Sequence, residues 1–437
     1  MQTRLLSLVV SCALGAGTAL AAEPLTAAVA VSNITPDTKT YHVPLGGYGE
    51  RQNAPATGVH DNTLCKALLL KQGDRKYAYV TVDLVGIPRS LRDEVVKRIG
   101  GTGIDSDTLM LVASHSHGST EMNAMNNKNV FENKAIGIYD EKLLVFTADQ
   151  IAAAIANANK QYQPVKVGTA SVQLEGLNRN RRDSPIIDKE LTVTRIDTID
   201  GRPFAVLVNW TAHPTFSGPQ TMEVTADWPG FLQREIEGFA PGATCLYSNG
   251  AEGDISTAGA QGPSEFARME DYGRKLAVKV LEMLPGIETS SEPVFDFSMT
   301  TLDLPEHVVP AALKDAAGPE YGLTPENLPA LLEAVSPESS YIGVLRLGDL
   351  LAVSIPGEMA SSLGIEIKNA LRDAGVQHPI IVGLANEWIS YMLPPDEYHK
   401  GGYEPGVSFY GETLGPTVVA QAIDAGKAVL AKKLVSR

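Results

Sequence analysis

The sequence predicts an α/β fold, with mixed β-sheets flanked by helices in a single large domain. Residues 77–85 (YAYVTVDLV) form a β-rich, nearly continuous apolar run, which is typical of a strand covered on both faces. A helix-like segment follows, and a second apolar run at 109–113 completes a strand, helix, strand order. No composition shift or low-complexity linker divides the 437 residues. One domain is therefore expected.

The other elements are predicted in mixed order along the chain. Ser90, with Asp93 three residues later, resembles a capping box that opens a helix ending at Gly100-Gly101. Asp200-Gly201 indicates a hairpin between two strands. Periodicity predicts further helices at 139–157, 229–239, 265–284, 329–335, 361–374 and 417–434, and strands at 165, 191 and 204–210 and near 246, 295, 341, 350 and 380.

The first residues are typical of a secretory leader. Arg4 precedes an apolar stretch at 5–20 and the small residues around Ala21, so 1–21 are predicted to be a signal peptide and 22–437 the mature domain. We expect a secreted or periplasmic protein. Lipoprotein anchoring at Cys12 is the less favoured alternative because the preceding apolar run is short. No later segment reaches about 18 uninterrupted apolar residues, so no transmembrane segment is expected.

Composition narrows the class of partner. The chain is 44% hydrophobic and 20% charged, as in soluble globular proteins. Its formal charge of −15 disfavours nucleic acid and anionic membrane surfaces as partners. Cys65 and Cys245 lie in apolar runs, where pairing and two buried free thiols are both compatible with the sequence. The sequence leaves the oligomeric state open.

Five apolar, strand-like runs end abruptly in residues capable of chemistry. In α/β sheets, ligands and reactive groups gather at one edge of the strands, so a site is expected where these runs end. The five endings are Ser114 to Gly118 (SHSHG), Thr211 to Pro214 (TAHP), Asn249 to Ser256 (NGAEGDIS), Pro356 to Glu358 (PGE) and Asn386 to Tyr391 (NEWISY).

Histidines dominate two of these endings. The spacing of His115 and His117 points both imidazoles to one face of an extended segment, and His213 occupies a similar position after another strand. Imidazoles with a carboxylate and no thiolate are typical of a catalytic zinc site, and Glu358 could supply that carboxylate. From spacing alone, Glu358 fits a solvated loop glutamate better.

Serine chemistry has weaker support from the residues alone. The Gly-x-Ser-x-Gly pattern is absent, and so is His-Glu-x-x-His. The loop at 249–256 contains two glycines, which would let backbone N–H groups approach a ligand. Oxyanion binding and a plain tight turn both fit this loop.

A colinear series of motifs resembles the catalytic domain of the neutral/alkaline non-lysosomal ceramidases over nearly the whole mature chain. The motifs are SNITP at 32–36, TGVHD at 57–61, VD at 82–83, HSHG at 115–118, NRNR at 178–181, NWTAHPT at 209–215, TAD at 225–227, GDIS at 253–256, PGE at 356–358, the 386–391 segment, YE at 403–404 and YG at 410–411. The longer ceramidases carry a further immunoglobulin-like domain after the catalytic one, and we expect this chain to hold the catalytic domain only.

The resemblance also implies roles for individual residues. His115, His213, Glu358 and Tyr391 correspond to ligands of one Zn²⁺ per chain. His117 corresponds to an acid/base group beside the metal, and Ser256 to the family's nucleophile, with zinc-activated water as the alternative attacking species. Arg181 and Tyr403 correspond to residues that face the substrate carbonyl; without the resemblance, Tyr403 would fit a packed aromatic better.

The function implied is that of a zinc-dependent amidohydrolase acting on linear amide C–N bonds. Such an enzyme would hydrolyse the N-acyl amide bond of ceramide, or of a related N-acyl lipid, to a fatty acid and an amine such as sphingosine. A zinc hydrolase of another amide, ester or lactone is the first alternative. A metal-containing binding protein without turnover is the second, and it is less favoured because binding alone would not require an acid/base group beside the metal.

Overall fold

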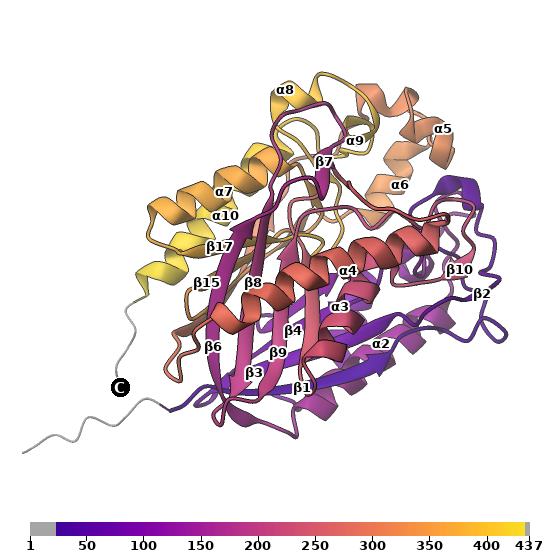
Figure 1. The fold of residues 1–437 in the computed structure, drawn as a ribbon. Helices are drawn as coiled ribbons and strands as arrows, with labels where there is room; N and C mark the ends of the chain where they lie inside the picture. Colours follow the sequence, from indigo (N-terminus) through magenta and orange to yellow (C-terminus); the bar gives the residue numbers. More distant parts are fainter. Residues whose placement is uncertain (1–22, 433–437) are drawn as a thin grey trace, which may run out of the picture.

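The computed structural model describes residues 23–432, so the predicted leader, 1–21, and Cys12 lie outside the described residues. Its centre is a mixed eight-stranded sheet (Figure 1). In spatial order the strands are β11 (Thr244–Asn249), β9 (Pro203–Trp210), β8 (Glu190–Thr198), β6 (Gln163–Gln173), β1 (Thr26–Asn33), β3 (Leu64–Gln72), β4 (Arg75–Val82) and β5 (Leu109–Ala113).

A second sheet has four strands. Their order is β13 (Phe295–Asp303), β14 (Ser339–Leu347), β15 (Leu350–Ser354) and β17 (His378–Val382). In both sheets most neighbours are antiparallel, whereas β4 with β5, β9 with β11 and β15 with β17 are parallel. Three short pairs lie outside the sheets: β2 (Gly58–Val59) with β10 (Glu223–Val224), β7 (Asn178–Asn180) with β12 (Ile255–Thr257), and β16 (Glu358–Met359) with β18 (Tyr391–Met392).

Helices cover the outer face of each sheet. The large sheet is covered by α1 (Arg89–Arg98) and α2 (Glu141–Ala158) at one end and by α3 (Asp227–Phe239) and α4 (Glu265–Met283) at the other (Figure 1). The smaller sheet is covered by α7 (Ser361–Asp373) and α10 (Leu414–Ala431), and α6 (Leu328–Val335) belongs to the same apolar cluster. The short helices α5 (Ala317–Tyr321), α8 (Pro395–Tyr398) and α9 (Tyr403–Gly406) complete the set, with the 3₁₀ segments η1 (Gly49–Arg51), η2 (Met122–Met125), η3 (Leu284–Gly286) and η4 (Ala311–Lys314).

The two sheets pack face to face. Alternate side chains of β3 point to opposite sides: Leu69 packs with the α1 and α2 helices, while Leu68 and Leu70 pack with Leu345 and Leu350 of the smaller sheet. Each strand is therefore covered by helix on one face and by sheet on the other. This arrangement explains the continuous apolar runs and confirms the predicted fold class of mixed sheets flanked by helices.

The predicted hairpin at Asp200-Gly201 is confirmed, because β8 ends at Thr198 and β9 begins at Pro203. The predicted capping box is wrong. Helix α1 begins at Arg89 after Pro88, and no side chain caps it. The hydroxyl of Ser90 donates instead to the side-chain oxygens of Asn126 and Asn127. A proline before the first turn fixes an extended entry to the helix, so Ser90 falls inside it.

The two cysteines within the described residues are free. Cys65 lies in β3 and Cys245 in β11, both fully buried in different parts of the core. Burial raises the pKa of both thiols, to about 12 for Cys245, because the interior disfavours the thiolate. They act as small apolar side chains.

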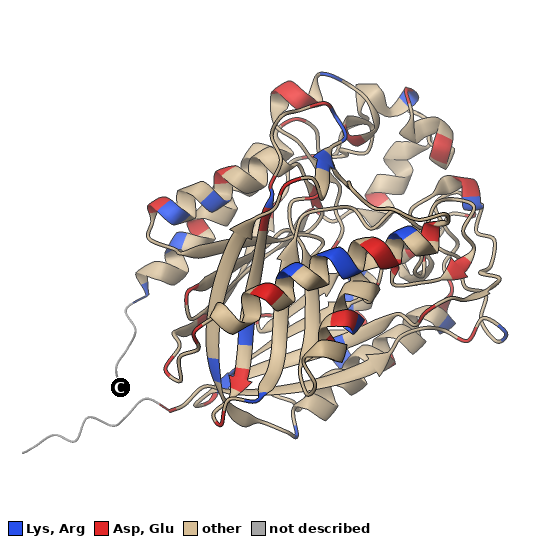
Figure 2. Ribbon diagram, in the orientation of Figure 1, with Lys and Arg blue, Asp and Glu red and all other residues tan. Residues whose placement is uncertain are grey.

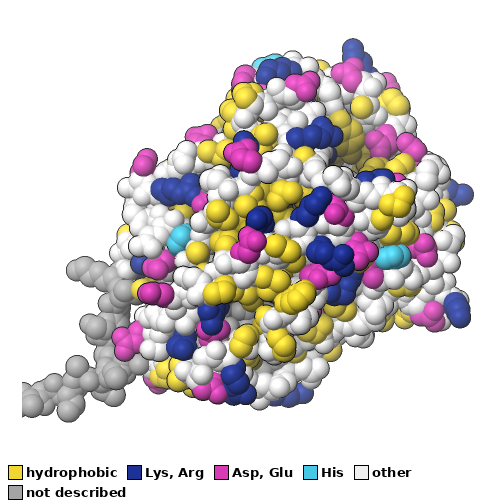
Figure 3. Space-filling model, viewed as in Figure 1, with side chains coloured by type: hydrophobic (Ala, Val, Ile, Leu, Met, Phe, Trp, Pro, Cys, Tyr) yellow, Lys and Arg dark blue, Asp and Glu magenta, His cyan; other side chains and the backbone are white. Residues whose placement is uncertain are grey.

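The surface carries charges of both signs. Acidic and basic residues are interspersed along α4 (Figure 2), and apolar side chains lie among them on the same face (Figure 3). Within residues 23–432, no helix combines the length and apolar character needed to cross a membrane.

Candidate metal centre and cavity

The strand endings picked out in the sequence converge on one region. The Asn209 side chain, at the end of β9, donates to the carbonyl of Ile381 in β17 over 2.8 Å. Past the end of β17, Asn386 exchanges two hydrogen bonds with the backbone of Leu111 in β5. These bonds join the two sheets where their polar endings emerge. The prediction of a site at a shared sheet edge therefore agrees with the geometry.

Three of the converging side chains form a compact buried cluster. Ligand atoms of His115, His213 and Glu358 all lie within 4.8 Å of one another. Oε2 of Glu358 is 2.9 Å from Nε2 of His213 and 3.3 Å from Nε2 of His115. Burial alone would raise the pKa of Glu358, but the two imidazoles outweigh it and hold that pKa well below its usual range. The cluster thus presents a carboxylate to two imidazoles.

Both imidazoles are oriented by the backbone. Nδ1 of His115 bonds the carbonyl of Val85, and Nδ1 of His213 bonds the carbonyl of Ile255 over 3.0 Å. A carbonyl accepts only from a protonated nitrogen, so each Nδ1 carries a hydrogen and each Nε2 faces the cluster. Two such nitrogens with a carboxylate match a zinc ligand set, and the carbonyls are the outer partners that orient metal-binding histidines.

His115 reaches this position by an unexpected backbone conformation. Its φ is +71°, in the left-handed region, so the segment is not extended as the spacing argument assumed. The two imidazoles nevertheless converge, with Nε2 of His117 3.4 Å from Nε2 of His115. Burial, followed by the neighbouring histidines, holds the pKa of His117 well below its usual value. His117 is a neutral imidazole against the cluster.

Tyr391 borders the same cluster. It pairs with Glu358 in the short parallel ladder of β16 and β18, and its hydroxyl lies 3.4 Å from Nε2 of His213. The hydroxyl also accepts a hydrogen bond from Nη2 of Arg181 over 3.1 Å. Burial and the Glu358 carboxylate raise the pKa of Tyr391 well above its usual value. Its position is compatible with a fourth ligand.

Arg181 and Tyr403 flank Tyr391. Arg181 pairs with Glu404 over 2.7 Å and donates to the carbonyl of Gly253. Burial opposes its charge, but Tyr391 and Glu404 together raise the pKa of Arg181, so the guanidinium stays charged. The ring of Tyr403 is 5.9 Å from that of Tyr391, and its hydroxyl is 2.9 Å from that of Tyr321. Arg181 and Tyr403 thus both lie next to Tyr391, and of the two only Tyr403 lines the cavity that opens from the cluster.

Ser256 lies at the edge of this arrangement. It belongs to β12 and forms an isolated parallel bridge with His213, next to the carbonyl of Ile255 that orients His213. Its side chain is half-buried and does not line the cavity that opens from the cluster. The backbone of Ser256 thus lies next to His213 of the cluster.

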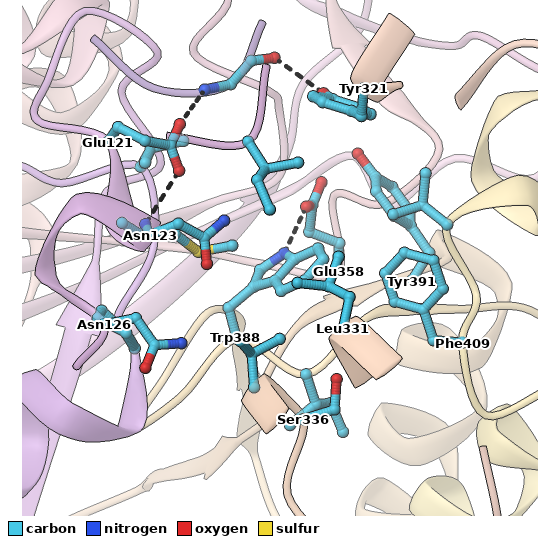
Figure 4. A pocket seen from close by; sticks show the side chains of 18 of the residues that line it. Glu121, Asn123, Asn126, Tyr321, Leu331, Ser336, Glu358, Trp388, Tyr391 and Phe409 are labelled. Carbon is cyan, nitrogen blue, oxygen red and sulfur yellow. Dashed lines mark hydrogen bonds between the residues drawn. The ribbon is translucent and has the colours of Figure 1, made fainter. Parts of the chain in front are cut away.

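A cavity opens from the cluster into an apolar space (Figure 4). His115, His117, Glu358, Tyr391 and Tyr403 line the end nearest the cluster. The larger share of the wall is apolar and includes Ile136, Leu331, Leu332, Val335, Val407 and Phe409. A polar reaction centre at the end of an apolar cavity suits an amphiphilic molecule.

Trp388 is a site residue that the sequence argument did not single out. Its indole N–H donates to Oε1 of Glu358 over 2.8 Å, and its ring lines the cavity (Figure 4). The signal available was its place inside the 386–391 ending, three residues before Tyr391. Glu404, which pairs with Arg181, likewise appears in the sequence argument only as the neighbour of Tyr403 in the YE motif.

The fold and site together define an α/β protein with a buried candidate metal centre. A family model described as neutral/alkaline non-lysosomal ceramidase, N-terminal, matches residues 28–250. The chain therefore belongs to the neutral/alkaline ceramidase family.

Individual relatives agree with this assignment. The chain is similar to the neutral ceramidase of Pseudomonas aeruginosa, with 22% identity across 84% of this chain and 67% of that protein. It is 21% identical to neutral ceramidase B of Dictyostelium discoideum, across 85% of this chain and 68% of that protein. The chain thus spans about two thirds of the length of these relatives.

Solved structures show the same fold. The crystal structure of the Pseudomonas aeruginosa neutral ceramidase superposes with a TM-score of 0.79 at 19% identity, covering 93% of this chain and 74% of that one. A structure described as ceramidase complexed with C2 gives a TM-score of 0.77 at 18% identity, covering 93% of this chain and 75% of that one.

Proposed function

We propose that this protein is a zinc-dependent amidohydrolase that cleaves the N-acyl amide bond of ceramide or of a related N-acyl lipid. The observation that carries the proposal is the cluster of His115, His213 and Glu358, whose two oriented Nε2 atoms and carboxylate face one another at the end of an apolar cavity. Membership of a family whose named relatives are neutral ceramidases supports the choice of an amide.

His115, His213, Glu358 and Tyr391 would hold one Zn²⁺. When bound, zinc lowers the pKa of a coordinated water to about 7 and polarises a carbonyl oxygen. The histidines and Glu358 suit zinc, because neutral imidazoles and a carboxylate are common ligands of catalytic zinc. The low pKa of Glu358 supports an ionised ligand at neutral pH.

The remaining residues would act on the amide itself. Hydrolysis breaks the C–N bond, forms a C–O bond to the former carbonyl carbon, and delivers a proton to the leaving nitrogen. His117, whose Nε2 lies 3.4 Å from that of His115 beside the cluster, would move that proton. Arg181 and Tyr403 would donate to the oxygen on which negative charge develops, and Ser256 would be the nucleophile.

The apolar wall supports a lipid substrate. Contacts from Leu331, Leu332 and Val335 of α6 would remove a hydrocarbon chain from water, at about 0.8 kcal/mol for each buried CH₂ group. Short polar amides would gain nothing from this surface. The cavity thus favours N-acyl amides with a long chain over small polar ones.

Metal analysis combined with ceramide hydrolysis, with and without a chelator, tests the proposal. We expect one zinc per chain, loss of turnover with chelator, and recovery on adding zinc back. Glu358→Gln should lose both metal and turnover, since a neutral amide is a poor zinc ligand. Glu387→Gln is the matched control for metal content: this buried carboxyl lines the same cavity but lies outside the cluster, so its variant should keep the zinc.

The lipid assignment and the metal assignment can be contradicted independently of each other. A panel of N-acyl amines of different chain lengths, with esters and lactones alongside, reports the preferred bond. Activity on short polar amides alone would contradict the lipid assignment, and full activity in a zinc-free Glu358→Gln variant would contradict the metal assignment.

Export is also proposed, from the leader-like residues 1–21. The protein would then act outside the cytoplasm, in the periplasm or the medium. Fractionation of cells expressing the full chain, with amino-terminal sequencing of the mature protein, tests it. Retention in the cytoplasm with residues 1–21 intact would contradict export.

A further inference from the structure

The cavity has a second polar wall, separate from the metal cluster. Two asparagines belong to this wall: Asn123 lies within η2, and Asn126 follows it directly. In Figure 4 both lie on one side of Trp388, and Glu358 and Tyr391 lie on the other. Ser336, which follows α6, also contributes to the lining. A cavity built only for a hydrocarbon chain would not need amide groups here.

The Asn126 amide is buried and held in one orientation. Its residue is only 6% exposed. Oδ1 accepts from the Ser90 hydroxyl over 3.1 Å and from the peptide N–H of Lys128 over 3.1 Å. Because a peptide N–H can bond only to the amide oxygen, Nδ2 must be the other atom, and it has no hydrogen-bond partner within residues 23–432.

Nδ2 of Asn126 is a fixed hydrogen-bond donor that lines the cavity and lacks a protein partner within residues 23–432. It therefore favours ligands that place an acceptor next to it. A plain hydrocarbon chain next to Nδ2 would exclude water and leave the donor unpaired, which costs free energy. An oxygen atom on that chain would restore the bond. Asn123 adds a second amide whose side chain also has no partner among the described residues.

We propose that Asn126 is a specificity residue that donates a hydrogen bond to an oxygen carried on the substrate chain, on the far side of Trp388 from the metal cluster. The preferred substrates are then N-acyl amides with a hydroxyl or carbonyl oxygen on the chain that fills this part of the cavity. The proposal rests on the proposed amidohydrolase function, because it assumes that the scissile amide lies at the cluster.

The test compares N-acyl amides of equal length, one with a plain chain and the others with a hydroxyl moved along it. The wild-type protein should favour at least one hydroxylated isomer by about tenfold in kcat/KM, the value expected for one neutral hydrogen bond. Asn126→Ala should reduce that ratio to about one. Asn126→Asp, which keeps the Oδ1 acceptor but replaces the donor with a second oxygen, should reduce it to one or below.

Asn127→Ala is the matched control. Asn127 bonds the same Ser90 hydroxyl but is exposed and does not line the cavity, so its variant should keep the wild-type ratio. Equal kcat/KM for plain and hydroxylated chains in the wild type would overturn the proposal. So would a preference that survives in both Asn126 variants, with folding checked by circular dichroism.

Binding separates this proposal from the proposed function. Trp388 lines the cavity, so its fluorescence reports occupancy without turnover. If none of the amides is hydrolysed, the proposed function fails. The Asn126 assignment then stands if hydroxylated amides bind about tenfold more tightly than plain ones and Asn126→Ala removes the difference, and it falls if the Kd values are equal.

Discussion

The indole N–H of Trp388 donates to Oε1 of Glu358 over 2.8 Å, while the other oxygen of the same carboxylate faces His115 and His213. The two oxygens therefore have separate partners. One is engaged by the indole, and the other is left for a metal ion. This division fixes the rotation of the carboxylate before any ligand binds.

Trp388→Phe removes the indole donor and keeps an aromatic ring. Zinc affinity should fall by about 10- to 100-fold, because outer partners that orient a ligand contribute on that scale. Competition with a chromogenic chelator measures it. Tyr403→Phe should keep the wild-type affinity, since Tyr403 lines the same cavity without bonding Glu358. Equal zinc affinity in Trp388→Phe and the wild type would contradict the orienting role.

Gly47→Ala should displace His117. Gly47 has φ of +83°, and a Cβ there would overlap the His117 ring. If His117 is the acid/base group, kcat should fall by at least about 100-fold. Gly101→Ala is the control, because Gly101 has φ of +91° but no atom near the added Cβ, so it carries the backbone strain alone. Equal kcat in the two variants would argue against the proposed role of His117.

Ser256→Ala separates the two candidate attacking groups. With Ser256 as nucleophile, turnover should fall by about 1,000-fold or more while the zinc content stays at the wild-type level. Steady-state kinetics with metal analysis on the same sample gives both values. Activity within about tenfold of the wild type would instead indicate attack by water, since the remaining groups would then suffice.

Asp83 should make stability depend on pH. Burial raises its folded-state pKa to about 6, against about 3.9 in the unfolded chain. Between these values the folded state binds more protons than the unfolded state, so the free energy of unfolding falls as pH rises from about 4 to about 6. The contribution is up to about 1.4 kcal/mol per pH unit.

Asp83→Asn should remove this component. An amide oxygen can still accept from the Leu64 N–H, which Asp83 bonds over 2.9 Å, so the fold is kept. Urea denaturation at several pH values between 4 and 6 should give a smaller slope of unfolding free energy against pH in the variant. Identical slopes in the two proteins would show that Asp83 titrates normally in the folded state.

Local pattern was enough for much of the fold. The helices α3, α4 and α7 begin or end within two residues of their predicted bounds, because each has a clear apolar stripe. Strand β1 was missed, since its run of alanines has weak β propensity and pairing with β3 decides its conformation. The Ser90 capping box failed because Pro88 sets the start of α1.

The sequence by itself determined the candidate residues. His115, His117 and His213 stand out locally because they end apolar strands, whereas Glu358 and Tyr391 were assigned as ligands through the family resemblance. Only the tertiary structure decided how they meet. The backbone of His115 takes a left-handed conformation in the folded chain. Two carbonyls orient the imidazoles, Trp388 bonds Glu358, and Ser90 bonds Asn126. Each of these bonds joins residues that are distant in the chain. Such contacts depend on the packing of one sheet against another, which no local spacing encodes.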